Sequence, residues 1–193
     1  MLSHLRPALS MLALFTVLTG VAYPLAITGV LQSVAPGTAQ GSLVARDGKV
    51  VGSALIGQAF TEPGYLQPRP SAVNYNAAAA GATNYAPTNK AYVAAVAERA
   101  TAYRAANGVT PPIDAVTTSA SGLDPDVSPE NAMDQVARIA AARHVDPAVV
   151  QGVIQSQVRG PWLGLYGQAR VNVLAANLAL DAAIGHEPNP PHS

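Results

Sequence analysis

Residues 9–34 read LSMLALFTVLTGVAYPLAITGVLQSV and contain no charged side chain. A run of about 20 apolar residues is long enough to cross a bilayer as a helix. Gly20 and Pro24 predict a kink in it, which membrane helices tolerate where the freed backbone groups find partners. We therefore predict that residues 1–34 form a short amino terminus and one transmembrane helix.

The charges around this helix predict its orientation. Arg6 precedes the helix, whereas Arg46 and Lys49 follow it at a distance. Positive residues that flank a membrane span concentrate on the cytoplasmic side. We therefore expect a cytoplasmic amino terminus and a main domain outside the membrane. The alternative is a cleavable signal peptide that ends at small residues such as Gly37-Thr38-Ala39.

The composition excludes several classes of function. Only 11% of the 193 residues are charged, compared with about 25% in typical soluble domains. The formal net charge is zero, so no basic surface predicts a nucleic acid as partner. The chain has no cysteine, which excludes disulfides, thiolate metal sites and cysteine nucleophiles.

The remainder of the chain predicts one small domain behind a linker. Residues 35–41 are small and turn-forming, which is typical of a linker, and residues 42–185 form the predicted domain. Residues 57–89 are rich in Gly, Pro, Asn and Tyr, and they predict a long loop that is packed rather than floppy. The polar, proline-rich residues 186–193 predict a disordered tail.

Local signals within this domain predict an α+β fold. Asp47-Gly48 lies between two apolar pairs and predicts a β-hairpin within residues 42–56. Ser128-Pro129 is typical of a helix cap followed by the first helical residue. Periodicity and caps together predict about four helices, at residues 90–106, 128–144, after Asp146-Pro147 and 171–184, with a short extended piece at Val116-Thr117.

Few residues in the sequence indicate a catalytic, metal-binding or phosphate-binding site. No GxxxxGK[ST] or GxGxxG pattern indicates a phosphate-binding loop, and the four histidines lack metal-ligand spacing. Ser121 and His144, together with an aspartate, leave an anchored hydrolase as one alternative. Asp124 and Asp126 could act as paired carboxylates, but turn formation and charge at a helix amino terminus explain them more simply.

Two further side chains are candidates for binding. Arg69 stands between Pro68 and Pro70, which hold its backbone extended. An arginine placed in this way can bind a carboxylate or phosphate, or it can bridge loops inside its own domain. Gln135 lies on the predicted helix after Ser128, where it could contact a ligand, although a lone helical glutamine usually lies on the surface.

A set of short segments stands out by its order along the chain. Together these segments resemble the C subunit of Kdp-type potassium-transporting ATPases, over Leu5 to Asp181. Departures from the family pattern at Asp126 and Val158-Arg159 fall in predicted loops or helix ends. The segments are LRPAL (5–9), GSALIGQ (52–58) with FT (60–61), RPSA (69–72), YN (75–76), the loop 81–89 ending in PTN, VT (116–117) before SGLD (121–124), RVNVL (170–174) and NLALD (177–181).

The resemblance implies an accessory, non-catalytic subunit of an ATP-driven, high-affinity potassium uptake pump in the bacterial cytoplasmic membrane. Its implied partners are a potassium-selecting channel-like subunit, a P-type ATPase subunit, a very small single-span subunit and the lipid bilayer. It also implies a chaperone role that raises the ATP affinity of the ATPase subunit, with Gln135 as the residue involved. ATP would then be reached only through the complex, and potassium is the transported ion.

The predicted orientation conflicts with this ATP role, because a domain outside the membrane cannot reach cytoplasmic ATP. We therefore expect the domain to cap the channel-like subunit, with residues 57–89 as the contact surface. Outside transport, the alternative is a membrane-anchored extracytoplasmic binding module. The candidate contact residues are Phe60, Tyr65, Arg69, Tyr75, Tyr85 and Asn89.

Overall fold

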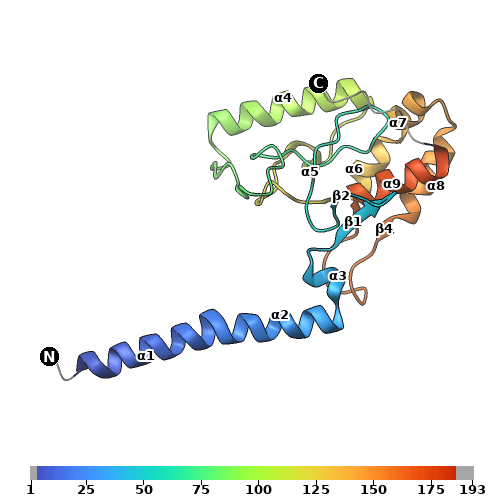
Figure 1. Ribbon diagram of the computed structural model, residues 1–193. Helices are drawn as coiled ribbons and strands as arrows, with labels where there is room; N and C mark the ends of the chain where they lie inside the picture. Colours follow the sequence, from blue (N-terminus) through green and yellow to red (C-terminus); the bar gives the residue numbers. More distant parts are fainter. Residues whose placement is uncertain (1–3, 186–193) are drawn as a thin grey trace. The chain divides into compact units, whose positions relative to one another are not determined.

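The computed structural model describes residues 4–185 and divides into two compact units (Figure 1). The first unit ends at Val51 and the second begins at Gly52. The tail predicted at residues 186–193 lies outside the described residues.

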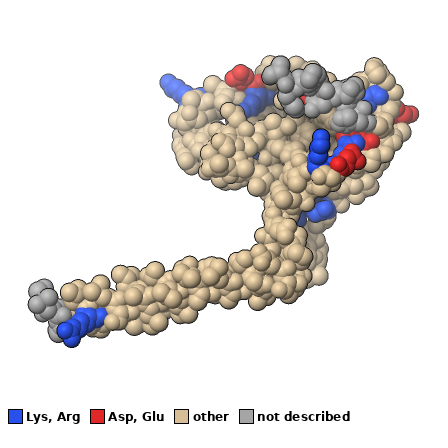
Figure 2. Space-filling view, viewed as in Figure 1, with Lys and Arg blue, Asp and Glu red and all other residues tan. Residues whose placement is uncertain are grey.

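A continuous helical stretch makes up most of the first unit. It consists of α1 (Leu5–Val17), the π-helical turn η2 (Leu18–Ala22) and α2 (Tyr23–Val34). None of its side chains is buried, and its surface is uncharged except at the amino-terminal end (Figure 2). The stretch confirms the prediction of one helix that is long and apolar enough to cross a membrane.

Pro24 explains the π-helical turn. In η2 the Tyr23 N–H donates to the Leu18 carbonyl, five residues back instead of the usual four. Pro24 has no N–H, and in a regular α-helix its ring would press on the carbonyl of Gly20. The wider turn gives that ring room, so the predicted kink takes the form of a π turn.

Three hydroxyl side chains in this helix donate hydrogen bonds to the backbone of the same helix. Thr19, Thr28 and Ser33 each donate to the carbonyl four residues earlier, at 2.6, 2.8 and 2.9 Å. In hydrocarbon, a polar group without a partner costs several kcal/mol, so this local bonding suits a membrane helix.

The predicted hairpin is confirmed. After the short helix α3 (Pro36–Ala39), which occupies part of the predicted linker, β1 (Leu43–Arg46) pairs with β2 (Lys49–Ser53). Asp47 and Gly48 both have positive φ, at 52° and 77°, as the tight hairpin turn requires.

The second unit packs helices around a small antiparallel sheet, so the predicted α+β class is confirmed (Figure 1). The strands lie in the order β3-β5-β4, with Val171 of the central strand opposite both Val127 and Val158. The elements are α4 (Lys90–Asn107), α5 (Ile113–Val116), β3 (Asp126–Val127), α6 (Pro129–Asp134), α7 (Val136–Arg143), α8 (Pro147–Ser156), β4 (Val158–Arg159), β5 (Arg170–Asn172) and α9 (Val173–Ile184).

Several boundaries differ from the predictions. The prediction of an extended piece at Val116-Thr117 was wrong, because Val116 is the last residue of helix α5. The last helix begins at Val173 rather than at residue 171, since the two preceding residues belong to β5. Asp126 and Val158-Arg159, expected in loops or helix ends, lie in strands. These strands span two or three residues, too few for alternation to be visible in the sequence.

The helix predicted at residues 128–144 is interrupted. Ser128 caps it as expected, because its hydroxyl accepts the Asn131 N–H at 3.0 Å. The helix then divides into α6 and α7 at Gln135, and His144 ends α7 in the left-handed conformation, with φ of 56°. The break directs the Gln135 side chain into the domain.

The core of the second unit includes one residue from the long loop. Leu66 is fully buried although no helix or strand lies between β2 and α4. Residues 57–89 are therefore irregular, as predicted, yet part of them is packed into the core. The core side chains are Leu66, Val127, Ala132, Val136, Ile139, Ala140, Val150, Ile154, Val171, Val173, Ala176 and Leu180.

Candidate functional site

Residues 63–67, in the middle of the long loop, are held by side chains in place of a neighbouring strand. Each of their five backbone carbonyls accepts a hydrogen bond from an arginine or an amide side chain. We call residues 63–67 the clamped segment, and the side chains that bind it the clamp. The pairs are Arg138 to Pro63 and Tyr65, Arg143 to Gly64, Asn177 to Leu66, and Gln135 to Gln67.

Two amides in the clamp imitate the pairing of β-strands. Asn177 accepts from the Leu66 N–H at 2.7 Å and donates to the Leu66 carbonyl at 3.0 Å. Gln135 does the same for Gln67, at 2.8 and 3.2 Å. Both backbone groups of two successive residues are thereby satisfied, as they would be in a sheet.

Gln135 is buried, not on the surface as a lone helical glutamine usually is. Only 2% of it is exposed. Besides its two bonds to Gln67, its amide donates to Asn131 Oδ1 at 2.9 Å and accepts from Arg138. A side-chain amide has two N–H groups and two acceptor lone pairs, so these four bonds leave none for a ligand.

A buried ion pair closes the other end of the clamped segment. Arg143 Nη2 lies 2.8 Å from Asp181 Oδ1, and both side chains are almost fully buried. The Arg143 guanidinium also lies 4.8 Å from the centre of the Tyr65 ring, whose hydroxyl donates to Asp181. Phe60 packs against the same ring, with centroids 5.8 Å apart. Removing one member of such a pair would leave the other charge buried without compensation.

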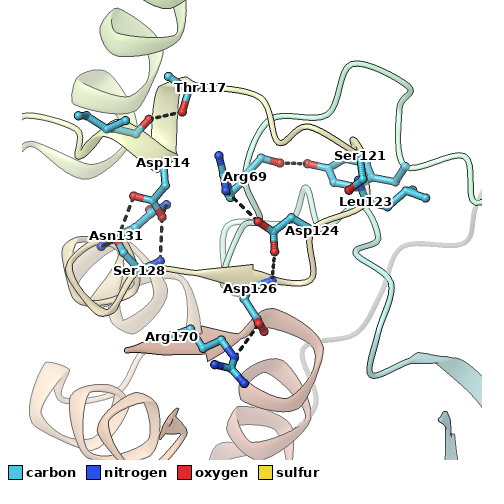
Figure 3. Close-up of polar contacts among 12 residues, drawn as sticks. Arg69, Asp114, Thr117, Ser121, Leu123, Asp124, Asp126, Ser128, Asn131 and Arg170 are labelled. Carbon is cyan, nitrogen blue, oxygen red and sulfur yellow. Dashed lines mark hydrogen bonds and ion pairs between the residues drawn. The ribbon is translucent and has the colours of Figure 1, made fainter. Parts of the chain in front are cut away.

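Arg69 ties the long loop to a second part of the domain (Figure 3). Its Nη1 donates to Asp124 at 2.8 Å, and its carbonyl accepts the Tyr75 hydroxyl at 2.6 Å. Ser71 Oγ donates to the Gly122 carbonyl at 2.7 Å. Of the two roles that the sequence left open for Arg69, the structure shows the bridge between loops.

Asp124 and Asp126 make different structural contacts. Asp124 accepts the backbone N–H of Asp126 at 3.0 Å, as expected of a turn former. Asp126 lies in β3, two residues before the Ser128 cap of α6, and pairs with Arg170 at 3.0 Å (Figure 3).

Asp114 binds the first turn of α6 (Figure 3). Its carboxylate accepts from the Ser128 N–H, the Ser128 hydroxyl and the Asn131 amide, at 2.8, 2.9 and 3.1 Å. Tyr103 of α4 donates to Asn131 Oδ1 at 3.0 Å. Burial, with the nearby charges of Asp134 and Asp114, raises the pKa of Tyr103, so its hydroxyl keeps its proton.

The predicted contact residues divide into internal and exposed groups. Phe60, Tyr65, Arg69 and Tyr75 make the internal contacts described above. Tyr85 is 49% exposed, and Asn89 is an exposed residue that caps α4. Tyr85 lines a hollow of about 260 Å³ whose other walls are residues 82–84, Pro87, Tyr92 and residues 117–120.

The positions of Ser121 and His144 do not support the alternative of an anchored hydrolase. Ser121 Oγ accepts the Leu123 N–H at 3.1 Å, and His144 is an exposed helix cap. No hydrogen bond joins the two within residues 4–185. The same described part of the chain also lacks a cluster of His, Asp and Glu able to hold a metal ion.

The sequence did not indicate most of the side chains that hold the clamped segment. Arg138, Arg143 and Asn131 carry no signal in the sequence, because a polar residue on a short helix is normally solvated. Asn177 and Asp181 did carry one. They stand four residues apart, and hence on one face, in the otherwise apolar helix VLAANLALDAAI.

Known proteins resemble this chain over nearly its whole length. The family described as "KdpC: K+-transporting ATPase, c chain" matches residues 5–182. A protein named Potassium-transporting ATPase KdpC subunit, from Cereibacter sphaeroides, is 61% identical over 95% of this chain and 99% of its own. Proteins of the same name from Caulobacter vibrioides and Polaromonas naphthalenivorans are 56% and 52% identical, covering 94% and 92% of this chain and 94% of each relative.

We expect Asn177→Ala to destabilise the domain, because it leaves the buried N–H and carbonyl of Leu66 without partners. Each buried group left unpaired costs about 1–3 kcal/mol. Denaturant unfolding of the full chain in detergent measures the change. Gln155→Ala, at an exposed position of α8, is the control and should change stability by less than about 0.5 kcal/mol. Equal stability of the two variants would show that the clamp is dispensable.

Proposed function

From the membership of this chain in the KdpC family of K+-transporting ATPase subunits, which makes it a component of a potassium pump, we propose one role. The chain assembles and stabilises that pump and does not itself catalyse a reaction. One observation carries this proposal. The polar side chains that could serve chemistry, Gln135, Arg69 and the Arg143–Asp181 pair, are bound within the fold. These side chains hold the long loop in one conformation.

A long loop held rigidly suits a contact surface. Binding that requires a loop to become ordered loses part of its affinity to the entropy of ordering, and a preformed loop avoids that loss. In this chain the clamp has already ordered residues 63–67, and Arg69 and Ser71 have tied the following residues to 122–124. The exposed part of the same loop around Tyr85 is then the surface offered to a partner.

We assign the partners from the family resemblance: a potassium-selecting channel-like subunit, a P-type ATPase subunit and a small single-span subunit. In this proposal the helix from Leu5 to Val34 lies in the bacterial cytoplasmic membrane with its amino terminus inside. Arg6 lies in the first turn of this helix and is its one Lys, Arg, Asp or Glu residue, which supports that orientation. The second unit then lies outside and caps the channel-like subunit.

A chaperone role in ATP binding through Gln135 stays a prediction. For Gln135 to contact a nucleotide, its amide would have to release Gln67 and Asn131, to which it is bound at 2.8 and 2.9 Å. Potassium is the transported ion of the pump, and its path is assigned here to the channel-like partner. An anchored binding module unrelated to transport is set aside, because family membership makes the chain a pump component.

Co-purification tests the contact surface. A tagged full chain, extracted in mild detergent, should bring down the channel-like and ATPase subunits in fixed stoichiometry. Tyr85→Ala should weaken this recovery, by about tenfold or more if Tyr85 is a central contact. Val149→Ala, at a position of α8 that is 47% exposed, should not. A chain that purifies alone would overturn the assembly role, and equal recovery of both variants would move the contact away from Tyr85.

Comparing two clamp variants tests the ATP prediction. If Gln135 acts only by holding the loop, Gln135→Ala and Asn177→Ala should lower pump activity alike, with no change in the KM for ATP. If Gln135 contacts nucleotide, only Gln135→Ala should raise that KM. The assay is ATP hydrolysis by the reconstituted pump at varied ATP concentration.

The absence of cysteine allows a direct test of orientation. Val93→Cys places one thiol on an exposed position of α4. We expect a membrane-impermeant maleimide to label it in intact cells. Labelling only after the membrane is permeabilised would place the domain in the cytoplasm, where contact with ATP becomes feasible.

A further inference from the structure

The loop between β4 and β5, residues 160–169, exposes large apolar side chains that the proposed function does not use. Its sequence, GPWLGLYGQA, contains no charge. Leu165 is 82% exposed, and Trp162, Leu163 and Tyr166 are also mostly exposed. Apolar side chains gathered at one place on a surface mark an interaction site. We call residues 160–169 the apolar loop.

The apolar loop has a defined conformation. The Trp162 N–H donates to the Tyr166 carbonyl at 2.8 Å, and the Tyr166 N–H donates back at 3.0 Å. The two rings lie 5.9 Å apart, and Leu163 and Gly164 turn the chain between them with positive φ. The loop is thus a closed turn whose leucine side chains are mostly exposed.

Two arginines face each other at the base of the apolar loop. Arg159 of β4 is directly opposite Arg170 of β5 in the antiparallel register. Like charges opposite each other destabilise a strand pair. Asp126 compensates Arg170 at 3.0 Å, whereas Arg159 is exposed and makes no ion pair within the described part of the chain. An anion at this base would relieve the repulsion.

The chain enters the second unit close to this base. Asn172, at the end of β5, donates to the Ala54 carbonyl at 3.1 Å, and the Gly52 backbone lies against Leu174. Ala169, the last residue of the apolar loop, precedes Asn172 by three residues, which is about 10 Å along a strand. The loop therefore lies near the point where the chain enters the second unit.

We propose that the apolar loop inserts into the interface of the lipid bilayer. Leu163 and Leu165 enter the boundary of the acyl chains, Trp162 and Tyr166 lie at the level of the headgroups, and Arg159 binds lipid phosphate. Trp and Tyr are enriched at this level of membranes, and basic residues beside apolar ones add attraction to anionic lipids.

Size favours lipid over a protein partner. A stable protein interface takes about 20–30 residues from each side, far more than one turn supplies. Lipid needs no matching shape, and each apolar side chain that it covers contributes by burial alone. The proposal depends on the membrane helix as an anchor but not on the orientation or the pump partners, so it can fail or stand independently of the proposed function.

The single tryptophan of the chain is a native probe for this loop, because it is Trp162. The full chain is reconstituted alone into vesicles of phosphatidylcholine and phosphatidylglycerol, in which phosphatidylcholines brominated at different depths replace the plain lipid. We expect blue-shifted Trp162 emission that loses most of its intensity with bromine near the headgroups and less with bromine at the bilayer centre. Emission typical of water-exposed indole, unchanged by brominated lipid, would overturn the proposal.

Matched variants separate insertion from mere proximity. Leu165→Ser should reduce the quenching, whereas Ile113→Ser, at a position that is 80% exposed elsewhere in the second unit, should leave it unchanged. Arg159→Gln should weaken the dependence of quenching on phosphatidylglycerol. If the blue shift arises only after the other pump subunits are added, the loop binds protein and the lipid proposal is wrong.

Discussion

The backbone of residues 63–67 is partly buried without belonging to a sheet, and each polar group that folding takes from water must find a partner. Side chains of α7, α9 and the α6–α7 junction provide these partners. Leu66 can occupy the core only because the Asn177 amide pairs with its N–H and carbonyl. Gln135 at the helix break and Arg143 of the buried ion pair both help to meet this requirement.

The same requirement separates structural from interaction residues. Polar side chains that resemble a binding site when viewed along the sequence, such as Gln135 and Arg69, are engaged inside the domain. In the proposed function, the outer part of the loop around Tyr85 and its hollow is the surface that contacts a partner. A rigid interior with its contact surface on a tied loop agrees with the role of a subunit that organises a larger pump.

The apolar helix and the apolar loop have features that suit contact with lipid rather than with water. In the helix from Leu5 to Val34, three hydroxyl groups bond to the backbone of the same helix and a π turn makes room for Pro24, so these groups are satisfied locally. The apolar loop lies near the point where the chain enters the second unit, and its base carries two opposed arginines. If the apolar loop binds lipid as proposed, the membrane helix and the loop would together restrict how the second unit can rotate.

Along the chain, local physics determined the membrane helix, the Asp47-Gly48 hairpin, the caps at Ser128 and Asp146 and the existence of the main helices, because each depends on residues a few positions apart. Only the tertiary structure decided the β3-β5-β4 sheet, whose strands are too short to show a period, and the burial of Gln135. It alone brought Gln67 to Gln135 and Leu66 to Asn177, which are 68 and 111 residues apart. A side-chain amide can bond to any exposed backbone group, so the choice among them is made by packing of the whole domain and not by neighbours in the sequence.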